Sequence, residues 1–144
     1  MDTYQTINDV LVRLFREIMD QEQKAIITEQ FRDITNNDMH IIEAIGIEEP
    51  RNMSSVAKSL SVTVGTLTIA VNALVKKGYV DRVRSEADRR VVLLSLTEKG
   101  EKAYYHHEKF HRDMVDAVIG LLSSEEQVVL AKALTNLSEF FRKF

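Results

Sequence analysis

The chain has 144 residues, a net charge of −3, 44% hydrophobic residues and no cysteine. This length suits a single globular domain with its own core, and a chain without cysteine has no disulfide framework, cysteine metal site or thiol switch. The sequence contains no run of 18 apolar residues and no signal-peptide pattern, so we expect a cytoplasmic protein without a membrane partner.

The charge is unevenly distributed along the chain. Residues 51–102 contain ten Lys/Arg and five Asp/Glu, a balance of +5, whereas the remainder contains nine and seventeen, a balance of −8. A basic block between acidic flanks is the electrostatic pattern expected of a protein that binds phosphate. The alternative is a surface whose charge is uneven by chance.

Three helices are predicted in the first 60 residues. Apolar residues at helical spacing predict a first helix over about Tyr4–Lys24. Several capping residues within Thr35–Asp38 begin a second helix, which ends near Gly46. Ser54 can cap a short third helix that continues through Leu60.

A fourth helix and a β-hairpin follow. Thr63 can accept a hydrogen bond from the backbone N–H of Thr66 and so cap a helix over 63–77, while Gly78 suits the left-handed position after it. Two β-rich runs, 79–84 and 91–96, are joined by a charged loop and predict a hairpin. Helix, strand, basic turn and strand in this order indicate a winged helix-turn-helix, which makes double-stranded DNA the expected partner.

Two further helices complete the chain. Thr97 caps a long helix to about Leu122, and Ser123–Glu126 is a capping box for the last one. Apolar residues of the last helix alternate spacings of four and three, as in a coiled-coil seam: Leu130, Leu134, Leu137, Phe141 and Phe144. We expect the terminal helices to pair between two subunits of a homodimer. The alternative is that they pack only within one chain.

The predicted fold class is mainly α with a small β wing. Residues 36–100 form the winged helix-turn-helix lobe, and residues 1–30 and 101–144 form a helical dimerisation region within a single chain of 1–144. The fourth helix would enter the major groove, where bases differ in their donors and acceptors. Arginines at the tip of the wing suit a narrow minor groove.

The candidate DNA-binding residues lie on the third and fourth helices and on the wing. We expect Asp88 to avoid DNA and to hold the Arg90 guanidinium by a bidentate pair. Lys76 and Lys77 suit phosphates, as do Arg82 and Arg84 on the first wing strand. The alternative is a solvated polar face. The candidates are Ser54, Ser55, Thr63, Gly65, Thr66, Thr68, Ile69, Asn72, Lys76, Lys77, Arg82, Arg84, Asp88, Arg89 and Arg90.

The segments 62–68, 74–80 and 88–100 resemble the MarR family of bacterial transcriptional regulators, and the resemblance covers essentially the whole chain. It implies an obligate homodimer with two winged lobes on a palindromic operator. Thr68 and Ile69 fall where the family's recognition helix meets bases, and Arg90 falls where its wing arginine enters the minor groove. Position 69 is often basic in the family and is Ile here, so one phosphate or guanine contact is absent.

Shorter segments resemble the FabT branch of this family: 31–34, 39–40, 62–66, 82–86, 88–92 and 110–111. That branch represses genes of type II fatty acid synthesis, and its corepressor is a long acyl chain on acyl carrier protein. An acyl chain needs a long apolar tunnel; the alternative is ordinary core packing of the same residues. The candidates are Leu14, Phe15, Ile18, Met19, Ile26, Ile27, Phe31, Met39, Ile42, Phe110 and Met114.

A zinc sensor is the rival interpretation. His107 and His111 are one helical turn apart, and His40 and Glu22 can complete a tetrahedral site. A zinc-sensing branch of the same family uses ligands on these helices, although a single His pair at this spacing is common by chance. The leading reading has no metal or cofactor.

Two other classes of protein are disfavoured. An enzyme would need a catalytic motif, and the chain has no Gly-rich phosphate loop, nucleophile elbow or close carboxylate pair in an expected cleft. A dimeric scaffold without DNA binding is opposed by the basic central segment.

Overall fold

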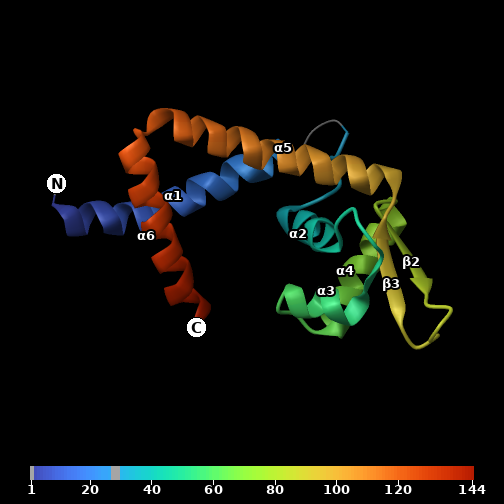
Figure 1. The fold of residues 1–144 in the computed structure, drawn as a ribbon. Helices are drawn as coiled ribbons and strands as arrows, with labels where there is room; N and C mark the ends of the chain where they lie inside the picture. Colours follow the sequence, from blue (N-terminus) through green and yellow to red (C-terminus); the bar gives the residue numbers. More distant parts are fainter. Residues whose placement is uncertain (1, 27–29) are drawn as a thin grey trace. The chain divides into compact units, whose positions relative to one another are not determined.

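The computed structural model describes residues 2–26 and 30–144 (Figure 1). It consists mostly of helices with one small three-stranded sheet, which confirms the expected fold class. The chain contacts divide it into two compact units, Met1–Glu108 and Lys109–Phe144. The expected division into a DNA-binding lobe and a dimerisation region stays a prediction.

Two of the first three helices begin at a side-chain cap. Helix α1 spans Thr3–Ile26 and α2 spans Asn36–Ile45, where Thr35 and Asp38 form a capping box. Helix α3 spans Met53–Ser59, but its N-cap is Asn52, whose side chain accepts from the Ser55 N–H at 2.9 Å. The expected cap at Ser54 is therefore wrong, because Asn52 already satisfies the first turn and Ser54 lies inside the helix.

Helix α4 spans Val64–Lys77 and begins and ends as predicted. The Thr63 hydroxyl accepts from the Thr66 N–H at 3.1 Å. Gly78 closes the helix with φ of +89°, a left-handed conformation that residues with a Cβ rarely adopt. Because both ends are fixed by local chemistry, the polar face of α4 has a defined length.

The sheet is antiparallel with the strand order β1-β3-β2. Strands β2, Val80–Arg84, and β3, Val92–Leu96, form the predicted hairpin, with Arg82 opposite Leu94. Strand β1, Arg51–Asn52, pairs with the other edge of β3. It was not predicted, since two residues after a proline carry no readable periodicity. β1 joins the start of α3 to the base of the wing.

One apolar core supports these elements. Its fully buried members include Ile42 of α2, Val56 of α3, Val71 and Leu74 of α4 and Leu94 of β3, each 0% exposed. Figure 1 shows α2, α3 and α4 grouped beside the sheet, with the hairpin of β2 and β3 extending away from them. The core therefore holds α4 from one side and leaves its polar side exposed.

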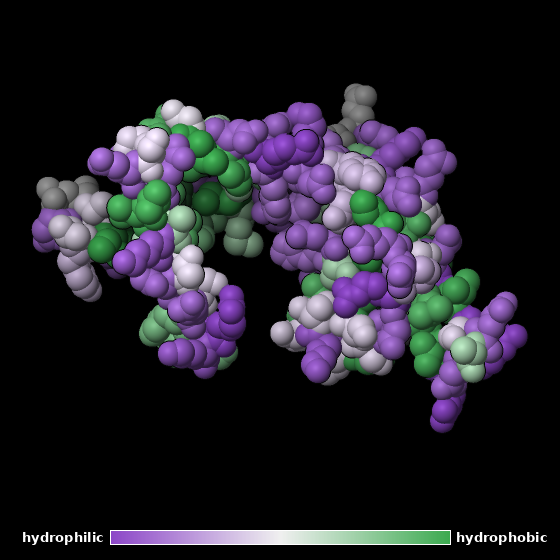
Figure 2. Space-filling view, viewed as in Figure 1, coloured by the Kyte–Doolittle hydropathy of each residue, from purple (hydrophilic) through white to green (hydrophobic). Residues whose placement is uncertain are grey.

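Helix α5 spans Glu98–Leu121, and α6 spans Ser124–Arg142 with the predicted Ser123–Glu126 capping box. No residue of α6 is buried within the described chain. Figure 2 shows apolar surface over this region, to which Leu134 and Phe141 contribute with exposed fractions of 48% and 58%. Helix α1 is similar, because its Ile7, Phe15 and Met19 are also exposed.

Among the described residues, no single helix is both long and apolar enough to cross a membrane. Taken together, α3 and α4 meet that criterion of length and composition, but their axes are bent by 107°.

Candidate nucleic-acid interface

The polar face of α4 lies opposite the core, as predicted. Its exposed members are Gly65, Thr66, Ile69, Asn72, Ala73 and Lys76. Ile69 is 73% exposed, so an apolar side chain projects from the middle of an otherwise polar surface. An exposed isoleucine on a helix suits contact with a thymine methyl group in the major groove.

Two side chains on this face have hydrogen bonds within the protein that limit the contacts they can make with DNA bases. The Thr68 hydroxyl donates to the Val64 carbonyl at 2.7 Å, so its proton is used within the helix. The Asn72 carbonyl oxygen accepts from the Arg82 guanidinium of β2. Arginine has no acceptor, so its guanidinium must face the Asn72 amide oxygen. The N–H donors of Asn72 therefore remain available to a base or a phosphate. The same bond ties α4 to the wing.

The tip of the wing carries the arginine clamp that the sequence predicts. Asp88 accepts from the Arg90 backbone N–H at 3.0 Å, from Nε at 3.1 Å and from Nη2 at 3.0 Å. The Arg90 side chain nevertheless remains 91% exposed. Bonds from the Arg90 side chain, and then from its backbone, hold the pKa of Asp88 below its ordinary value. Asp88 therefore stays ionised and fixes the direction in which Arg90 points.

The loop behind the clamp is braced by further bonds. Arg84 donates to the Arg89 carbonyl at 2.9 Å, and the Ser85 N–H donates to the Val91 carbonyl at 2.8 Å. The end of the hairpin is hydrophilic in Figure 2. A tip that is already held in one shape loses little conformational entropy when it binds. It therefore suits the presentation of cations to phosphates.

A hollow of about 410 Å³ lies between α3, α4 and the wing. It brings Thr68 of α4 together with Arg82, Arg84 and Arg90 of the wing, and its wall includes Ser54 at the start of α3. Three arginines around one groove favour an anionic occupant. This arrangement brings together candidates that are up to 36 positions apart in sequence.

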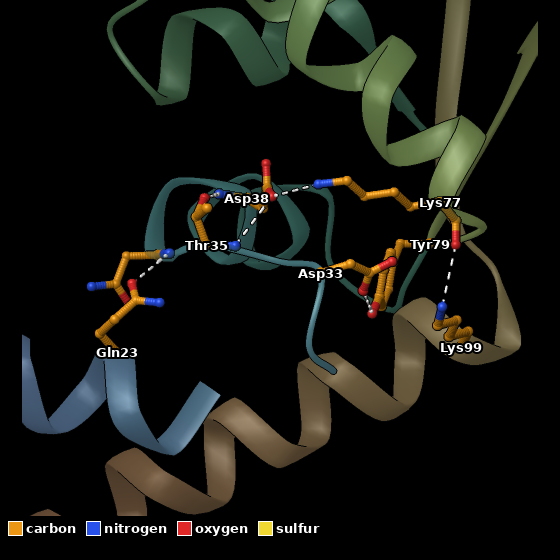
Figure 3. A network of polar contacts seen from close by, with 8 residues as sticks. Gln23, Asp33, Thr35, Asp38, Lys77, Tyr79 and Lys99 are labelled. Atoms are coloured by element: carbon orange, nitrogen blue, oxygen red, sulfur yellow. Dashed lines mark hydrogen bonds and ion pairs between the residues drawn. The ribbon is translucent and has the colours of Figure 1, made fainter. Parts of the chain in front are cut away.

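The two lysines at the end of α4 differ in their surroundings. Lys76 is exposed, whereas the Lys77 Nζ lies 3.4 Å from Asp38 Oδ2. Figure 3 shows Lys77 reaching Asp38, Tyr79 pointing to Asp33, and Lys99 approaching the backbone of Lys77. The sequence analysis predicted that both lysines contact phosphates. In the structure Lys77 pairs instead with Asp38 of the same chain.

The candidate effector residues have different environments. Ile26, Phe31, Met39 and Ile42 are packed in the core with at most 2% exposed, so a ligand would have to displace them. Leu14, Phe15 and Met19 are exposed on α1, and Ile18 is half-buried there. Phe110 and Met114 are half-buried on the C-terminal part of α5, and Ile27 lies outside the described residues. The tunnel stays a prediction.

The rival metal site has one buried centre. His107 is 3% exposed, and its Nε2 lies 3.1 Å from Glu43 Oε2 and 3.4 Å from Glu22 Oε1. Glu22 was an expected ligand, but Glu43 was not. His40 is exposed and lines a separate hollow with Glu43, Arg51 and Ser59. His111 follows His107 by one turn of α5.

Three residues that contact or line the candidate sites were missed in the sequence analysis. Asn52 caps α3 and lines the arginine hollow, and the pattern Asn-x-x-Ser offered a capping signal for it. Asp38 was named only within the capping segment Thr35–Asp38, and Glu43 was not named. No local signal identifies their partners, because Lys77 and His107 are 39 and 64 positions away.

Comparisons with known proteins give a consistent family. Residues 23–109 match the family model described as transcriptional regulator SarA/Rot. The structure is similar to Streptococcus pneumoniae FabT in complex with DNA, with a TM-score of 0.92 and 43% identity, covering 97% of this chain and 98% of that one. It is also similar to AbsC, a MarR family transcriptional regulator of Streptomyces coelicolor, with a TM-score of 0.76, 26% identity and coverage of 100% and 97%.

A sequence relative supports the same conclusion. The transcriptional regulator ZitR of Lactococcus lactis is 30% identical over 112 residues, which cover 76% of this chain and 77% of ZitR. The family and the fold are those of DNA-binding transcription regulators and not of enzymes. With its capped recognition helix and its arginine-tipped wing, this chain belongs to the MarR family of transcriptional regulators.

Proposed function

We propose that this regulator represses genes of fatty acid synthesis by binding a palindromic operator as a homodimer, with long-chain acyl-acyl carrier protein as its corepressor. The support is the extent of the similarity to FabT, 43% identity over 97% of the chain, together with the resemblance of the wing and flanking segments to that branch. Such a repressor works on chromosomal DNA in the bacterial cytoplasm.

The observation that carries the operator-binding mode is the clamp of Asp88 on an exposed Arg90. In this mode α4 enters the major groove with Ile69 and Asn72 toward the bases, and Arg90 enters the neighbouring minor groove. Ser54, Thr66 and Lys76 contact the sugar-phosphate backbone. The remaining exposed candidates, Ser55, Thr63, Gly65 and Arg89, border this surface.

The apolar side chains of the terminal helices support the homodimer. Leu130, Leu134 and Leu137 of α6 and Ile7 and Leu11 of α1 are each at least 36% exposed. Large exposed apolar side chains at helical spacing on a folded chain indicate an association surface. A two-fold dimer presents two α4 helices, so the operator should contain half-sites about 10 base pairs apart, one helical turn.

The corepressor is tested by titrating a duplex operator with the regulator in the presence of long-chain acyl-acyl carrier protein or of carrier protein without an acyl chain. We expect only the acylated form to tighten binding, because a ligand shifts an equilibrium only by its differential affinity for the two states. Met114→Trp should block this response more than it weakens basal binding. Phe31→Trp is a poorer probe, since Phe31 is 2% exposed and packs on Tyr79 and His106.

A zinc-responsive repressor is the second candidate, and the two carboxylates on buried His107 favour it. Neutral imidazole and carboxylate oxygen are suitable zinc ligands. Under this hypothesis EDTA abolishes tight operator binding, and His107→Ala with His111→Ala has the same effect. Sensitivity to EDTA combined with indifference to acyl-acyl carrier protein would replace the corepressor proposal with this one.

A further inference from the structure

The C-terminal end of α4 is fastened to an acidic segment of the protein. The Lys77 side chain is 33% exposed, and that of its partner Asp38 is only 12% exposed. The same Asp38 oxygen also accepts from the Thr35 N–H at 3.1 Å, so the carboxylate is held in place by the cap of α2. Lys77 thus has a partly buried, preorganised partner, unlike the exposed Lys76 beside it.

A second contact holds the chain two residues later. Tyr79 is 0% exposed, and its hydroxyl donates to Asp33 Oδ1 at 2.6 Å. Burial, and then this hydrogen bond, raises the pKa of Tyr79, so the phenol stays protonated and remains a donor. Lys99 of α5 lies 4.4 Å from the centre of the Tyr79 ring and donates to the Lys77 carbonyl at 3.3 Å.

The backbone at this corner also leaves little freedom. Thr97 donates through its hydroxyl to the Gly78 carbonyl at 2.6 Å and through its N–H to the Tyr79 carbonyl at 3.0 Å. A Cβ at Gly100 would clash with that same Tyr79 carbonyl oxygen. The end of α4 is therefore fixed between the segment 33–38 and the start of α5 (Figure 3).

We propose that Asp38 is a positioning residue for operator binding and acts through Lys77, whose charge is used on Asp38 rather than on a phosphate. The inference rests on the proposed operator-binding mode of α4. Ile69 and Asn72 lie upstream on the same helix, so a change in its orientation at Lys77 moves both in the groove. Simple electrostatics predicts the opposite, because removing a negative charge from a DNA-binding lobe should strengthen binding.

The test is Asp38→Asn, with Asp81→Asn as the matched control. Asparagine can still accept from the Thr35 N–H, but it loses the charge that holds Lys77. Asp81 is exposed on β2 and lies outside the proposed contacts. We expect Asp38→Asn to raise the operator Kd about three- to tenfold, a typical range for a coupling residue, and Asp81→Asn to bind equally or more tightly. Each Kd is referred to the active fraction from stoichiometric titration, so partial unfolding alone does not change it.

The salt dependence separates positioning from phosphate contact. Lys76→Met should lower the slope of log K against log salt by about 0.9 for each subunit, or about 1.8 for the proposed homodimer, because each subunit loses one phosphate contact. Lys77→Met should weaken binding without changing the slope, and Lys77→Arg should retain wild-type affinity because arginine can pair with Asp38. In the double variant with Asp38→Asn, Lys77→Met should add little further loss, since both remove the same pair.

Two results would overturn the inference: wild-type or tighter binding by Asp38→Asn, or a slope for Lys77→Met that falls as far as that of Lys76→Met. If Asp38→Asn does not fold, the Lys77→Met and Lys77→Arg pair decides the question alone. Failure of the wild-type protein to bind any selected duplex would instead contradict the proposed operator binding itself.

Discussion

Helices α2 and α4 of the winged part and helix α6 all carry apolar residues at helical spacing, but these residues differ strongly in burial. Core residues of α2, α4 and β3 such as Ile42, Leu74 and Leu94 are 0% exposed, whereas Leu134 and Phe141 of α6 are 48% and 58% exposed. Leaving such side chains in water forgoes about 25 cal/mol for each Å² of apolar surface. The winged part folds around its own stripes, and the exposed stripe of α6 is the surface that we propose for association with a second chain.

Placing charges on the apolar face of α6 should have the largest effect on assembly and operator binding. Leu134→Glu together with Leu137→Glu should convert the proposed dimer to a monomer at micromolar concentration, because two buried carboxylates from each subunit would oppose association. Losing the second half-site should weaken operator binding by at least about 100-fold, the scale of bivalent binding. Light scattering after gel filtration and an operator titration measure the two effects.

Asn136→Glu is the control for this change, since it adds a carboxylate to the same helix outside the apolar seam. It should leave both the mass and the affinity unchanged. A doubly charged variant that stays dimeric and binds normally would show that α6 is not the association surface.

The wing provides the next largest effect. Arg90→Ala should weaken operator binding by at least about 1 kcal/mol, or about fivefold, without changing the melting temperature. Asp88→Ala should also weaken it, although it removes a negative charge, because Arg90 loses three hydrogen bonds that direct it. Fluorescence anisotropy with a labelled duplex measures both.

Glu86→Ala tests whether this reflects orientation or charge. Glu86 is an exposed acid on the same loop, so its removal should leave binding equal or tighter. If Asp88→Ala also binds more tightly, orientation of Arg90 is not the role of Asp88.

The smallest expected effect concerns stability at the corner after α4. Tyr79→Phe should lower the free energy of unfolding at pH 7 by about 1 kcal/mol, the usual contribution of one hydrogen bond. The bond from Tyr79 holds the pKa of Asp33 below its usual value of 3.8. This contribution is present above pH 3.8 and is lost as the pH falls further through the lowered pKa of the folded state.

Urea denaturation of the wild type and of Tyr79→Phe at several pH values measures this difference. It should be constant between about pH 5 and 8 and shrink toward pH 3 as Asp33 is protonated. A difference that grows on acidification would show that the Tyr79–Asp33 bond does not involve an ionised carboxylate.

Local chemistry explains which features the sequence could predict. Thr63, Gly78, Thr97 and Ser123 mark helix ends through bonds that reach only a few residues, and the structure has each of them as expected. The Asp88–Arg90 clamp was predictable for the same reason, because its partners are two positions apart.

Features that depend on residues far apart in the sequence could not be predicted from local patterns. Strand β1 forms only because Arg51 and Asn52 pair with Leu94 and Leu93. Lys77 appeared to be a solvated phosphate contact because its partner, Asp38, lies 39 positions earlier. The acyl tunnel stays a prediction, since an apolar residue such as Phe31 has the same sequence signature in a packed core as in a cavity.

Selection of bound sequences from a random duplex library, followed by titration of the selected duplex with wild type and Arg90→Ala, tests the central claim most directly. The account predicts a palindrome whose half-sites lie about 10 base pairs apart, bound by a dimer and more weakly by Arg90→Ala. Enrichment of no sequence, or of a non-palindromic site bound equally well by both proteins, would contradict it.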